Sequence, residues 1–321
     1  FLRRDGRYMG RLSCREPANV FLRKRQFALA DDSAFCTRAA RRMVQGKLLN
    51  QATVLARIRR SRGQEAAGEG AHELRRLARK AEDATDVDSL RGLEGSGAAC
   101  YFRHLPLAFS RDWGFSRRVR RPPTDPVNAV LSLLYTLLIN RCCAAVRIAG
   151  LDPAPACLHA AAYGRQSLPL DLVEEFRPMV ADTLTISLFN MRMLRREDFE
   201  TPPPQDAEAE GGDADEVDAL LRDPVGLMSP DNAVPDVSDL PGEQLNTPPP
   251  DAPAPGARPV LLCKEAFRKV LTAFHRKMET EFFHPVAERQ MTYGDALIFQ
   301  ARLYRRLIEG EVEEYSPLML R

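Results

Sequence analysis

The first quarter of the chain contains its longest pattern of helical periodicity. It begins after Asp32 and Ser33, which are favourable N-cap residues. The apolar positions that recur at helical spacing are Phe35, Ala39, Met43, Leu48, Ala52 and Leu55. This pattern predicts a long amphipathic helix with one buried face.

The other face of this predicted helix carries basic side chains. They are Arg38, Arg41, Arg42, Lys47, Arg57 and Arg60. A basic stripe can follow a phosphate backbone, because each Lys or Arg contact releases counterions. It can equally be a solvated helix face, and the pattern alone favours neither interpretation.

The most apolar segment covers residues 127–148. Asp125 can cap it, Pro126 suits its first turn, and Gly150 marks its end. Because the segment is apolar nearly all round, it predicts the buried spine of an α-helical domain.

Several shorter patterns extend the helical prediction. Helices are expected over residues 73–82, after the capping pair Asp88 and Ser89, and over residues 179–194, 260–283 and 292–308. Glycines predict a loop over residues 63–70.

The start of the chain has a different pattern. Residues 7–12 and 20–27 are short, extended-looking runs, with Gly10 and Pro17 as breakers. We therefore expect residues 1–30 to be the end of a β-rich N-terminal domain. Because the first residue is Phe, we expect either a truncation or the continuation of a larger polypeptide.

Residues 201–259 differ from the rest in composition and charge. They hold 13 Asp and Glu against two arginines, and 13 of the chain's 24 prolines. Such a segment cannot bury enough apolar surface to fold, so we predict a disordered acidic insertion. A flexible tether is favoured over a segment that mimics DNA. Without its charge of −11, the chain's net +2 becomes +13 on the remainder, which suggests a polyanionic partner.

The predicted fold is therefore mainly α. A helical domain is expected over residues 31–200 and 260–321, behind the remnant of the β-rich domain. The longest apolar run, residues 129–139, is far shorter than the roughly 20 residues that span a bilayer. We expect no membrane partner and a cytoplasmic location. The seven cysteines contain no C-x-x-C pair, which favours reduced thiols over a zinc site.

Candidate chemistry is concentrated in residues 159–178. His159 precedes Asp171, Glu174 and Glu175, and Asp171 and Glu174 are three apart, on one face of a helix. Gly164 and Pro169 mark a loop that would bring the imidazole over the acids.

Glu94 is a further candidate from a segment far earlier in the chain. Small residues surround it, and they would let a ligand approach closely. Imidazole and carboxylates together suit Mg²⁺ or Mn²⁺ and suggest phosphodiester chemistry. A structural histidine and a solvent-exposed glutamate are the alternatives from spacing alone.

Linked motifs give this chain a resemblance to a known family. They are Gly46-Lys-Leu-Leu-Asn-Gln51, Leu93-Glu94-Gly95 with Ala98-Ala99 and Tyr101-Phe102, residues 121–138 from Arg-Pro-Pro-Thr-Asp-Pro, Leu158-His159 with Gly164-Arg165, Asp171-Leu-Val-Glu-Glu-Phe-Arg-Pro178, residues 293–300, and Tyr315-Ser-Pro317. Together they resemble the CRISPR-associated spacer-acquisition integrase, the "Cas-one" protein, over residues 20–200 and 260–318.

The resemblance implies a metal-dependent DNA endonuclease and integrase. Such proteins insert spacer DNA into a CRISPR array by 3′-hydroxyl attack on repeat phosphodiesters, in antiviral defence. It implies Glu94, His159 and Glu174 as ligands of Mg²⁺ or Mn²⁺, with Asp171 as a supporting catalytic acid. In relatives the position of Glu174 is often Asp.

The resemblance also implies partners. They are double-stranded DNA as prespacer and repeat, a second copy in a homodimer, the small ferredoxin-like "Cas-two" subunit, and in some relatives a fused reverse transcriptase or a "Cas-four" type nuclease. The arginines expected to contact DNA are Arg38, Arg41, Arg42, Arg117, Arg118, Arg120, Arg121 and Arg165. A DNA-binding assembly subunit with an incomplete site and a branched-DNA repair nuclease are the competing functions.

Overall fold

A computed structural model of the chain describes residues 19–120, 122–160, 165–202 and 258–320. The α-helices are α1 (Val20–Ala30), α2 (Ser33–Arg62), α3 (Glu65–Lys80), α4 (Val87–His104), α5 (Pro126–Ile148), α6 (Ser167–Val173), α7 (Thr183–Asn190), α9 (Lys264–Met278) and α10 (Tyr293–Glu309). The shorter elements are η1 (Ala81–Asp83), η2 (Leu105–Ala108), the π-helical turn η3 (Pro178–Asp182), η4 (Arg196–Asp198), and the strands β1 (Phe199–Glu200), β2 (Leu261–Leu262), β3 (Glu281–His284) and β4 (Arg289–Thr292). The mainly α prediction is confirmed.

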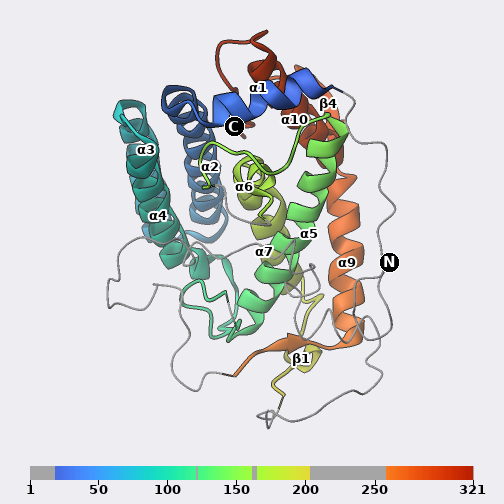
Figure 1. The fold of residues 1–321 in the computed structure, drawn as a ribbon. Coiled ribbons are helices and arrows are strands. Elements are labelled where there is room, and N and C mark those ends of the chain that lie inside the picture. Colours follow the sequence, from blue (N-terminus) through green and yellow to red (C-terminus); the bar gives the residue numbers. More distant parts are fainter. Residues whose placement is uncertain (1–18, 121, 161–164, 203–257, 321) are drawn as a thin grey trace.

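Two groups of helices enclose the core (Figure 1). Helices α2, α3 and α4 lie side by side, while α5 and α9 stand opposite them. Between the two groups run α6 and α7, and α1 and α10 pack together at one end.

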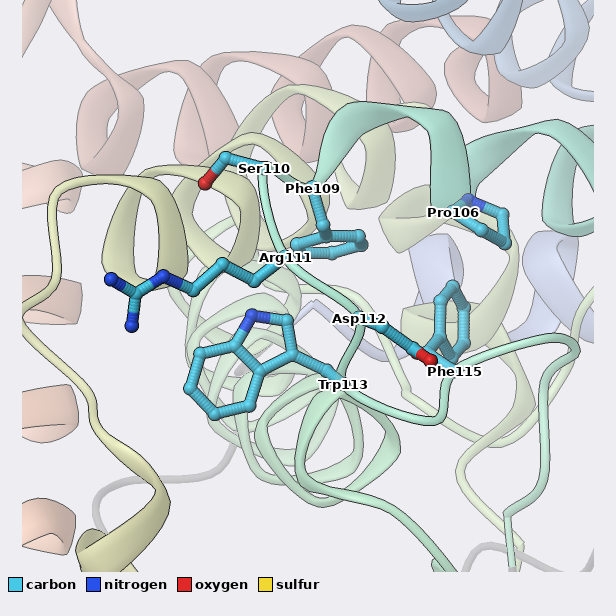
Figure 2. Close-up of a pocket in the computed structure, with 7 residues that line it drawn as sticks. All are labelled: Pro106, Phe109, Ser110, Arg111, Asp112, Trp113 and Phe115. Atoms are coloured by element: carbon cyan, nitrogen blue, oxygen red, sulfur yellow. The ribbon is translucent and has the colours of Figure 1, made fainter.

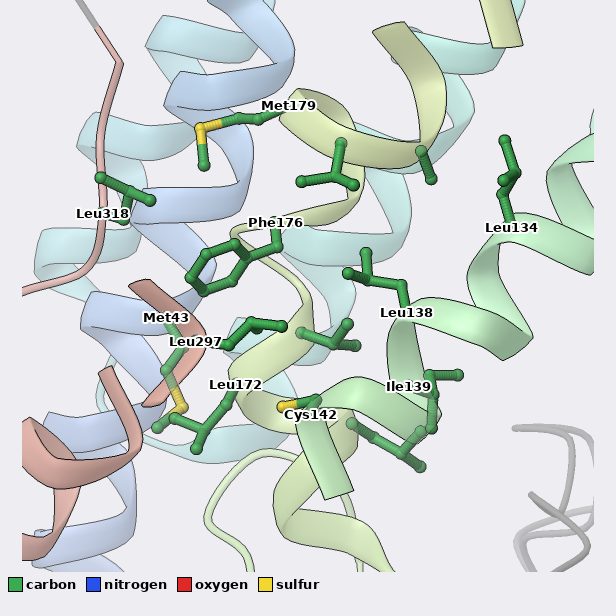
Figure 3. Close-up of a cluster of buried hydrophobic side chains, with 14 of the residues drawn as sticks. Met43, Leu134, Leu138, Ile139, Cys142, Leu172, Phe176, Met179, Leu297 and Leu318 are labelled. Carbon is green, nitrogen blue, oxygen red and sulfur yellow. The ribbon is translucent and has the colours of Figure 1, made fainter. Parts of the chain in front are cut away.

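The main core cluster lies where these elements meet. Figure 3 shows Met43 from α2, Leu138 from α5, Phe176, Leu297 from α10 and Leu318 from the C-terminal tail. All five are buried. Because distant segments share this cluster, the position of each helix depends on the others.

Helix α5 is the predicted spine. It starts at Pro126, and Asp125 Oδ1 accepts a hydrogen bond from Asn128 N at 2.9 Å, as an N-cap should. It is long and apolar enough to cross a membrane, but 72% of its most apolar window is buried inside the protein. That burial is typical of a core helix.

Two predicted segments differ from the structure. The prediction of an extended run over residues 20–27 is wrong, because these residues lie in α1, which has Asn19 as its N-cap. The other predicted run, residues 7–12, falls within residues 1–18, which lie outside the described residues. The loop over residues 63–70 is also wrong beyond Gln64, because α3 begins at Glu65. Gly68 and Gly70 are there for packing: an added Cβ would approach Arg59 and His104 within 2.6 and 2.7 Å.

The helix predicted to end at residue 283 stops five residues earlier. Met278 ends α9, and the following Glu281–His284 pairs antiparallel with Arg289–Thr292 as a hairpin. Two phenylalanines before Pro285 favour a strand and turn over continued helix.

Strands β1 and β2 pair antiparallel at the two ends of the acidic segment. Phe199 lies opposite Leu262, and Glu200 opposite Leu261. The chain therefore leaves and rejoins the helical body at neighbouring points. The disorder predicted for the insertion falls on residues 203–257, which lie outside the described residues.

Candidate functional site

Glu94 and Glu174 converge on one cation, the ammonium of Lys47. Lys47 Nζ donates to Glu94 Oε1 and lies 2.6 Å from Glu174 Oε2. The side chains of Lys47 and Glu174 are only 7% and 4% exposed, whereas that of Glu94 is 27% exposed. Two carboxylates far apart in the sequence therefore share one cation, with Glu94 on the solvent side.

Packing between α2 and α4 brings Lys47 of α2 close to Glu94 of α4. Gly97 of α4 lies against α2, where an added Cβ would approach Leu48 Cδ2 to 2.1 Å. Gly92 and Gly95 flank Glu94 and face open space. The small residues predicted around Glu94 therefore have two roles. Gly97 allows α4 to pack closely on α2, and Gly92 and Gly95 leave Glu94 accessible.

His159 is held by Asp171. Asp171 Oδ1 lies 2.7 Å from His159 Nδ1, and its two oxygens accept hydrogen bonds from three consecutive backbone N–H groups, those of Cys157, Leu158 and His159. The carboxylate is buried and engaged on both oxygens. Asp171 therefore fixes the ring with Nε2 as the nitrogen left for a ligand, the arrangement usual for metal-binding histidines.

Two further contacts fix the loop that carries His159. Arg91, one turn before Glu94 on α4, donates from Nε to Leu158 O at 2.7 Å. Ser167 Oγ at the start of α6 donates to Ala160 O at 3.0 Å. The histidine loop is thus joined to α4, which bears Glu94, and to α6, whose C-terminal end Glu174 caps.

Arg177 is the second cation of the site, and its side chain is 18% exposed. Its Nη1 lies 2.9 Å from Glu174 Oε1, and its guanidinium lies 4.9 Å from the centre of the Tyr135 ring. The Tyr135 hydroxyl donates to Asp182 Oδ1 at 2.7 Å, and the Tyr101 hydroxyl donates to Asp182 Oδ2 at 2.9 Å. Glu174 is therefore held by Arg177, which lies against Tyr135, and the Tyr135 hydroxyl is in turn hydrogen-bonded to Asp182.

The charges decide the protonation of Glu174. Burial would raise the pKa of this carboxyl, but Arg177, Lys47 and His159 outweigh burial and lower its pKa to about 2. Burial likewise disfavours the charged form of Lys47, yet Glu174 and Glu94 raise its pKa. Glu174 is therefore an anion and Lys47 a cation at neutral pH.

Glu174 and Glu175 both lie in the turn between α6 and η3, and their side chains have different partners. Glu175 turns away from Lys47 and accepts hydrogen bonds from Gln300 Nε2, the Tyr315 hydroxyl and Leu318 N at 2.9, 2.8 and 2.7 Å. Burial raises the pKa of Glu175 to about 7 despite these donors. Glu175 thus anchors the C-terminal tail, while Glu174 faces the site.

Comparison with known proteins adds family membership to this geometry. The family model described as "CRISPR associated protein Cas1" matches residues 1–206. The CRISPR-associated endonuclease Cas1 3 of Thermus thermophilus is 31% identical over 321 residues, which is 100% of this chain and 78% of that protein. The chain belongs to the Cas1 family.

Two solved structures show the same fold at lower identity. A casposase bound to integration product has a TM-score of 0.71 and 18% identity, covering 100% of this chain and 74% of that one. A Cas6-RT-Cas1–Cas2 complex has a TM-score of 0.70 and 22% identity, covering 99% of this chain and 29% of that one. These structures show a shared fold, while the family model and the Thermus thermophilus relative confirm the Cas1 family resemblance in the motifs.

The donor chemistry of this Cas1 family member fits a divalent cation. Among the described residues, no group of three His, Cys, Asp or Glu side chains is close enough to hold a metal ion as it stands. However, Glu94 and Glu174 already aim oxygens at one positive charge, and His159 lies close enough to Glu174 to lower its pKa. Carboxylate oxygens with one imidazole form a set that Mg²⁺ and Mn²⁺ accept.

Two of the eight arginines assigned to DNA are misplaced. Arg118 is buried and donates to Asn128 Oδ1 and Ser132 Oγ at 2.8 and 2.9 Å, and Arg165 is also buried. Because both side chains are buried, neither guanidinium group is presented to a DNA backbone in this structure.

The other arginines assigned to DNA differ in exposure. Arg38 and Arg117 are exposed, and Arg120 is half-buried. Arg41 and Arg42 are half-buried and donate to the carbonyls of Ala84 and Tyr315. Arg121 lies outside the described residues. No observation tests DNA binding by these six arginines, so their DNA role stays a prediction.

An aromatic hollow lies apart from these residues. It has a volume of about 310 Å³ and is lined by Pro106, Phe109, Ser110, Arg111, Asp112, Trp113 and Phe115. Figure 2 shows the Trp113 and Phe109 rings in its wall. None of the candidate metal ligands lines it, so the catalytic candidates form a separate site.

Sequence reasoning assigned Lys47 to the wrong face and did not assign Arg177 at all. Lys47 is buried, although it was placed in the basic stripe. Its spacing of four residues from both Met43 and Gln51, which are buried, was the signal that could have placed it inside. The six described cysteines are free thiols, and Cys14 lies outside the described residues.

Proposed function

We propose that this chain is a divalent-metal-dependent DNA endonuclease and integrase of CRISPR spacer acquisition. The observation that carries the proposal is the convergence of Glu94 and Glu174 on one cation, beside the histidine that Asp171 orients. The names of the relatives support it, since the Thermus thermophilus protein is called an endonuclease and the casposase was solved with an integration product.

Glu94, His159 and Glu174 would hold Mg²⁺ or Mn²⁺. When bound, such an ion polarises a scissile phosphate and lowers the pKa of an attacking hydroxyl. Asp171 holds the imidazole in the tautomer that leaves Nε2 to bind, and Arg177 fixes the direction of the Glu174 carboxylate. Asp171 and Arg177 therefore already orient two of the three proposed ligands, and Lys47 would have to move.

The proposed substrates are a double-stranded prespacer fragment and the CRISPR repeat. A 3′-hydroxyl of the fragment attacks a repeat phosphodiester, the new phosphodiester forms, and the old 3′-oxygen leaves. Glu94 is the most exposed of the three ligands, so the DNA approaches from its side of the site. Arg38, Arg117 and Arg120 are the arginines proposed to contact its phosphates.

The proposed assembly contains a second copy of the chain and a Cas2-type subunit. One solved neighbour is a complex of a Cas6-RT-Cas1 chain with Cas2, and another relative is a Cas4–Cas1 fusion. A fused reverse transcriptase or nuclease in the same polypeptide and a cytoplasmic location complete the proposal.

The first prediction concerns the ligands themselves. His159→Ala and Glu174→Gln should each reduce metal-dependent integration of a labelled DNA fragment by more than about 100-fold, since even partners of metal ligands commonly contribute 10- to 100-fold. DNA binding measured without divalent metal should change little. His275→Ala on the exposed part of α9 is the matched control and should retain activity.

The outcomes separate the competing functions. Unchanged integration by both variants contradicts the assignment. No integration by the wild type, with metal-dependent cleavage of branched duplexes, indicates a repair nuclease. DNA binding without any metal-dependent reaction indicates a non-catalytic assembly subunit.

A further inference from the structure

We infer that Lys47 is a built-in counter-ion that competes with the divalent metal. Its ammonium must leave the gap between Glu94 and Glu174 for a metal ion to enter, and a DNA phosphate is its new partner. Metal binding thereby becomes dependent on DNA. This inference rests on the proposed function, because it requires the metal site described there.

The contacts of Lys47 place it in the position that a metal would take. Its ammonium touches one oxygen of each candidate carboxylate ligand, and its side chain is 7% exposed. Arg177 binds the other oxygen of Glu174, Oε1. Lys47 therefore contacts both Glu94 Oε1 and Glu174 Oε2, the oxygens that a metal ion between the two glutamates would bind.

The backbone beneath Lys47 is fixed, so only its side chain can move. Gly46 packs so closely on the C-terminal tail that an added Cβ would lie 2.6 Å from Pro317 Cβ. Asn50 Nδ2, less than one turn further along α2, donates to Glu175 O and Leu318 O at 2.9 and 2.7 Å. Displacement of the ammonium is therefore a rotation of the lysine stem and leaves α2 in place.

Charge explains why the lysine must move when a metal binds. The carboxylates of Glu94 and Glu174 are balanced by Lys47 and Arg177, so a divalent ion adds two positive charges to a neutral cluster. Like charges a few ångströms apart repel strongly in a buried site. The planar guanidinium of Arg177 is held against Tyr135, whereas the lysine ends a flexible four-carbon stem. Lys47 is therefore the cation that gives way.

DNA supplies the charge that makes this exchange favourable. The open side of the site lies at Glu94, next to Gly92 and Gly95, which face empty space. A phosphate there would accept the displaced ammonium and offset the charge of the metal. By linkage, metal and DNA then raise each other's affinity.

The test compares Mn²⁺ affinity by calorimetry in wild type and Lys47→Met. Without DNA, the variant should bind Mn²⁺ about tenfold or more tightly than wild type, because the competing charge is gone. A short DNA duplex should increase the affinity of wild type more than that of the variant. Lys269→Met is the matched control, since Lys269 pairs with Asp198 at 3.0 Å elsewhere in the fold. It should bind Mn²⁺ as wild type does.

A second variant tests the inference in case Lys47→Met does not fold. Lys47→Gln keeps a hydrogen-bond donor toward the carboxylates and should tighten Mn²⁺ binding in the same direction. Equal or weaker Mn²⁺ binding by folded Lys47 variants overturns the inference.

The same experiment separates this inference from the proposed function. If Glu174→Gln abolishes Mn²⁺ binding while Lys47→Met leaves it unchanged, the metal site stands and the role of Lys47 is wrong. If neither wild type nor any variant binds Mn²⁺, with or without DNA, the metal site itself is wrong, and the inference is wrong with it.

Discussion

At the scale of single residues, charge is concentrated in buried contacts between α2, α4 and the turn after α6. Glu94, Lys47, Glu174 and Arg177 alternate in sign, which lets four charged groups share a mostly buried site. Unpaired buried charges are costly, so each of these residues depends on its neighbours. Asp182, reached from Arg177 through Tyr135, is a further buried carboxyl, and its hydrogen bonds do not fully offset its burial.

The pH dependence of stability should report on Asp182. Burial raises its pKa to about 6, although Tyr135 and Tyr101 donate to it. A carboxyl whose pKa is raised on folding loses stability as pH rises from its unfolded value near 4 to about 6. Asp182→Asn removes this loss. Its free energy of unfolding, relative to wild type, should therefore rise by roughly 2 to 3 kcal/mol between pH 4 and pH 7.

Urea unfolding at the two pH values measures this difference. Asp86 is the control, because the backbone N–H and hydroxyl of Ser89 lower the pKa of this exposed N-cap. Asp86→Asn should show the opposite sign. A difference for Asp182→Asn that does not vary with pH would contradict the assigned burial effect.

The sequence could predict site residues only where chemistry and spacing agree. His159, Asp171 and Glu174 are close in sequence, and their grouping was predicted. Glu94 was joined to them through a family motif, because helix packing over 65 residues is invisible to local periodicity. Asp171 orients His159, and this contact depends on a loop conformation that residue spacing does not predict.

At the scale of elements, the turn between α6 and η3 and the C-terminal tail position the site together. The tail is bound by Glu175 from the turn and by Asn50 from α2. Pro317 of the tail packs on Gly46, the residue before Lys47. The tail therefore joins the two elements that supply Lys47 and Glu174.

Glycine positions test this packing directly. Gly46→Ala should destabilise the protein by about 1 to 3 kcal/mol, since the new methyl group overlaps Pro317 in a full core. Gly92→Ala is the matched control, because its Cβ meets open space in the middle of α4 and should stabilise the helix by up to about 1 kcal/mol.

Denaturant midpoints of the two variants decide the outcome. Equal midpoints for Gly46→Ala and Gly92→Ala would show that the tail does not pack on α2 as described. A lower midpoint for Gly46→Ala alone is the expected result.

Helix positions were predictable where amphipathic pattern and capping residues coincide. Asp32 and Asp125 marked the true starts of α2 and α5. Prediction was wrong where tertiary contacts override local preference, as at the glycines that α3 uses for close packing and at the hairpin after Met278. Local patterns do not contain those contacts.

At the scale of the whole molecule, the described helices form one body. The net charge of residues 201–259 is negative, whereas that of the rest of the chain is positive. The pairing of β1 with β2 joins the chain on either side of residues 203–257. Because the two ends already meet, the helical body does not need that segment to close its fold.

Replacing residues 203–257 by a short Gly-Ser linker should therefore keep the melting temperature within about 3 °C of wild type. Differential scanning calorimetry measures it. A much larger drop would show that the segment contributes to the packed fold, and that the β1–β2 pair does not suffice to hold its ends.

The most direct measurement is anomalous X-ray diffraction from crystals of this chain grown with Mn²⁺ and a short DNA duplex. We predict one Mn²⁺ ion within about 2.0 to 2.6 Å of oxygens of Glu94 and Glu174 and of Nε2 of His159, with the Lys47 ammonium moved to a phosphate. An anomalous peak elsewhere, or none with Lys47 still bridging the two glutamates, would contradict the account.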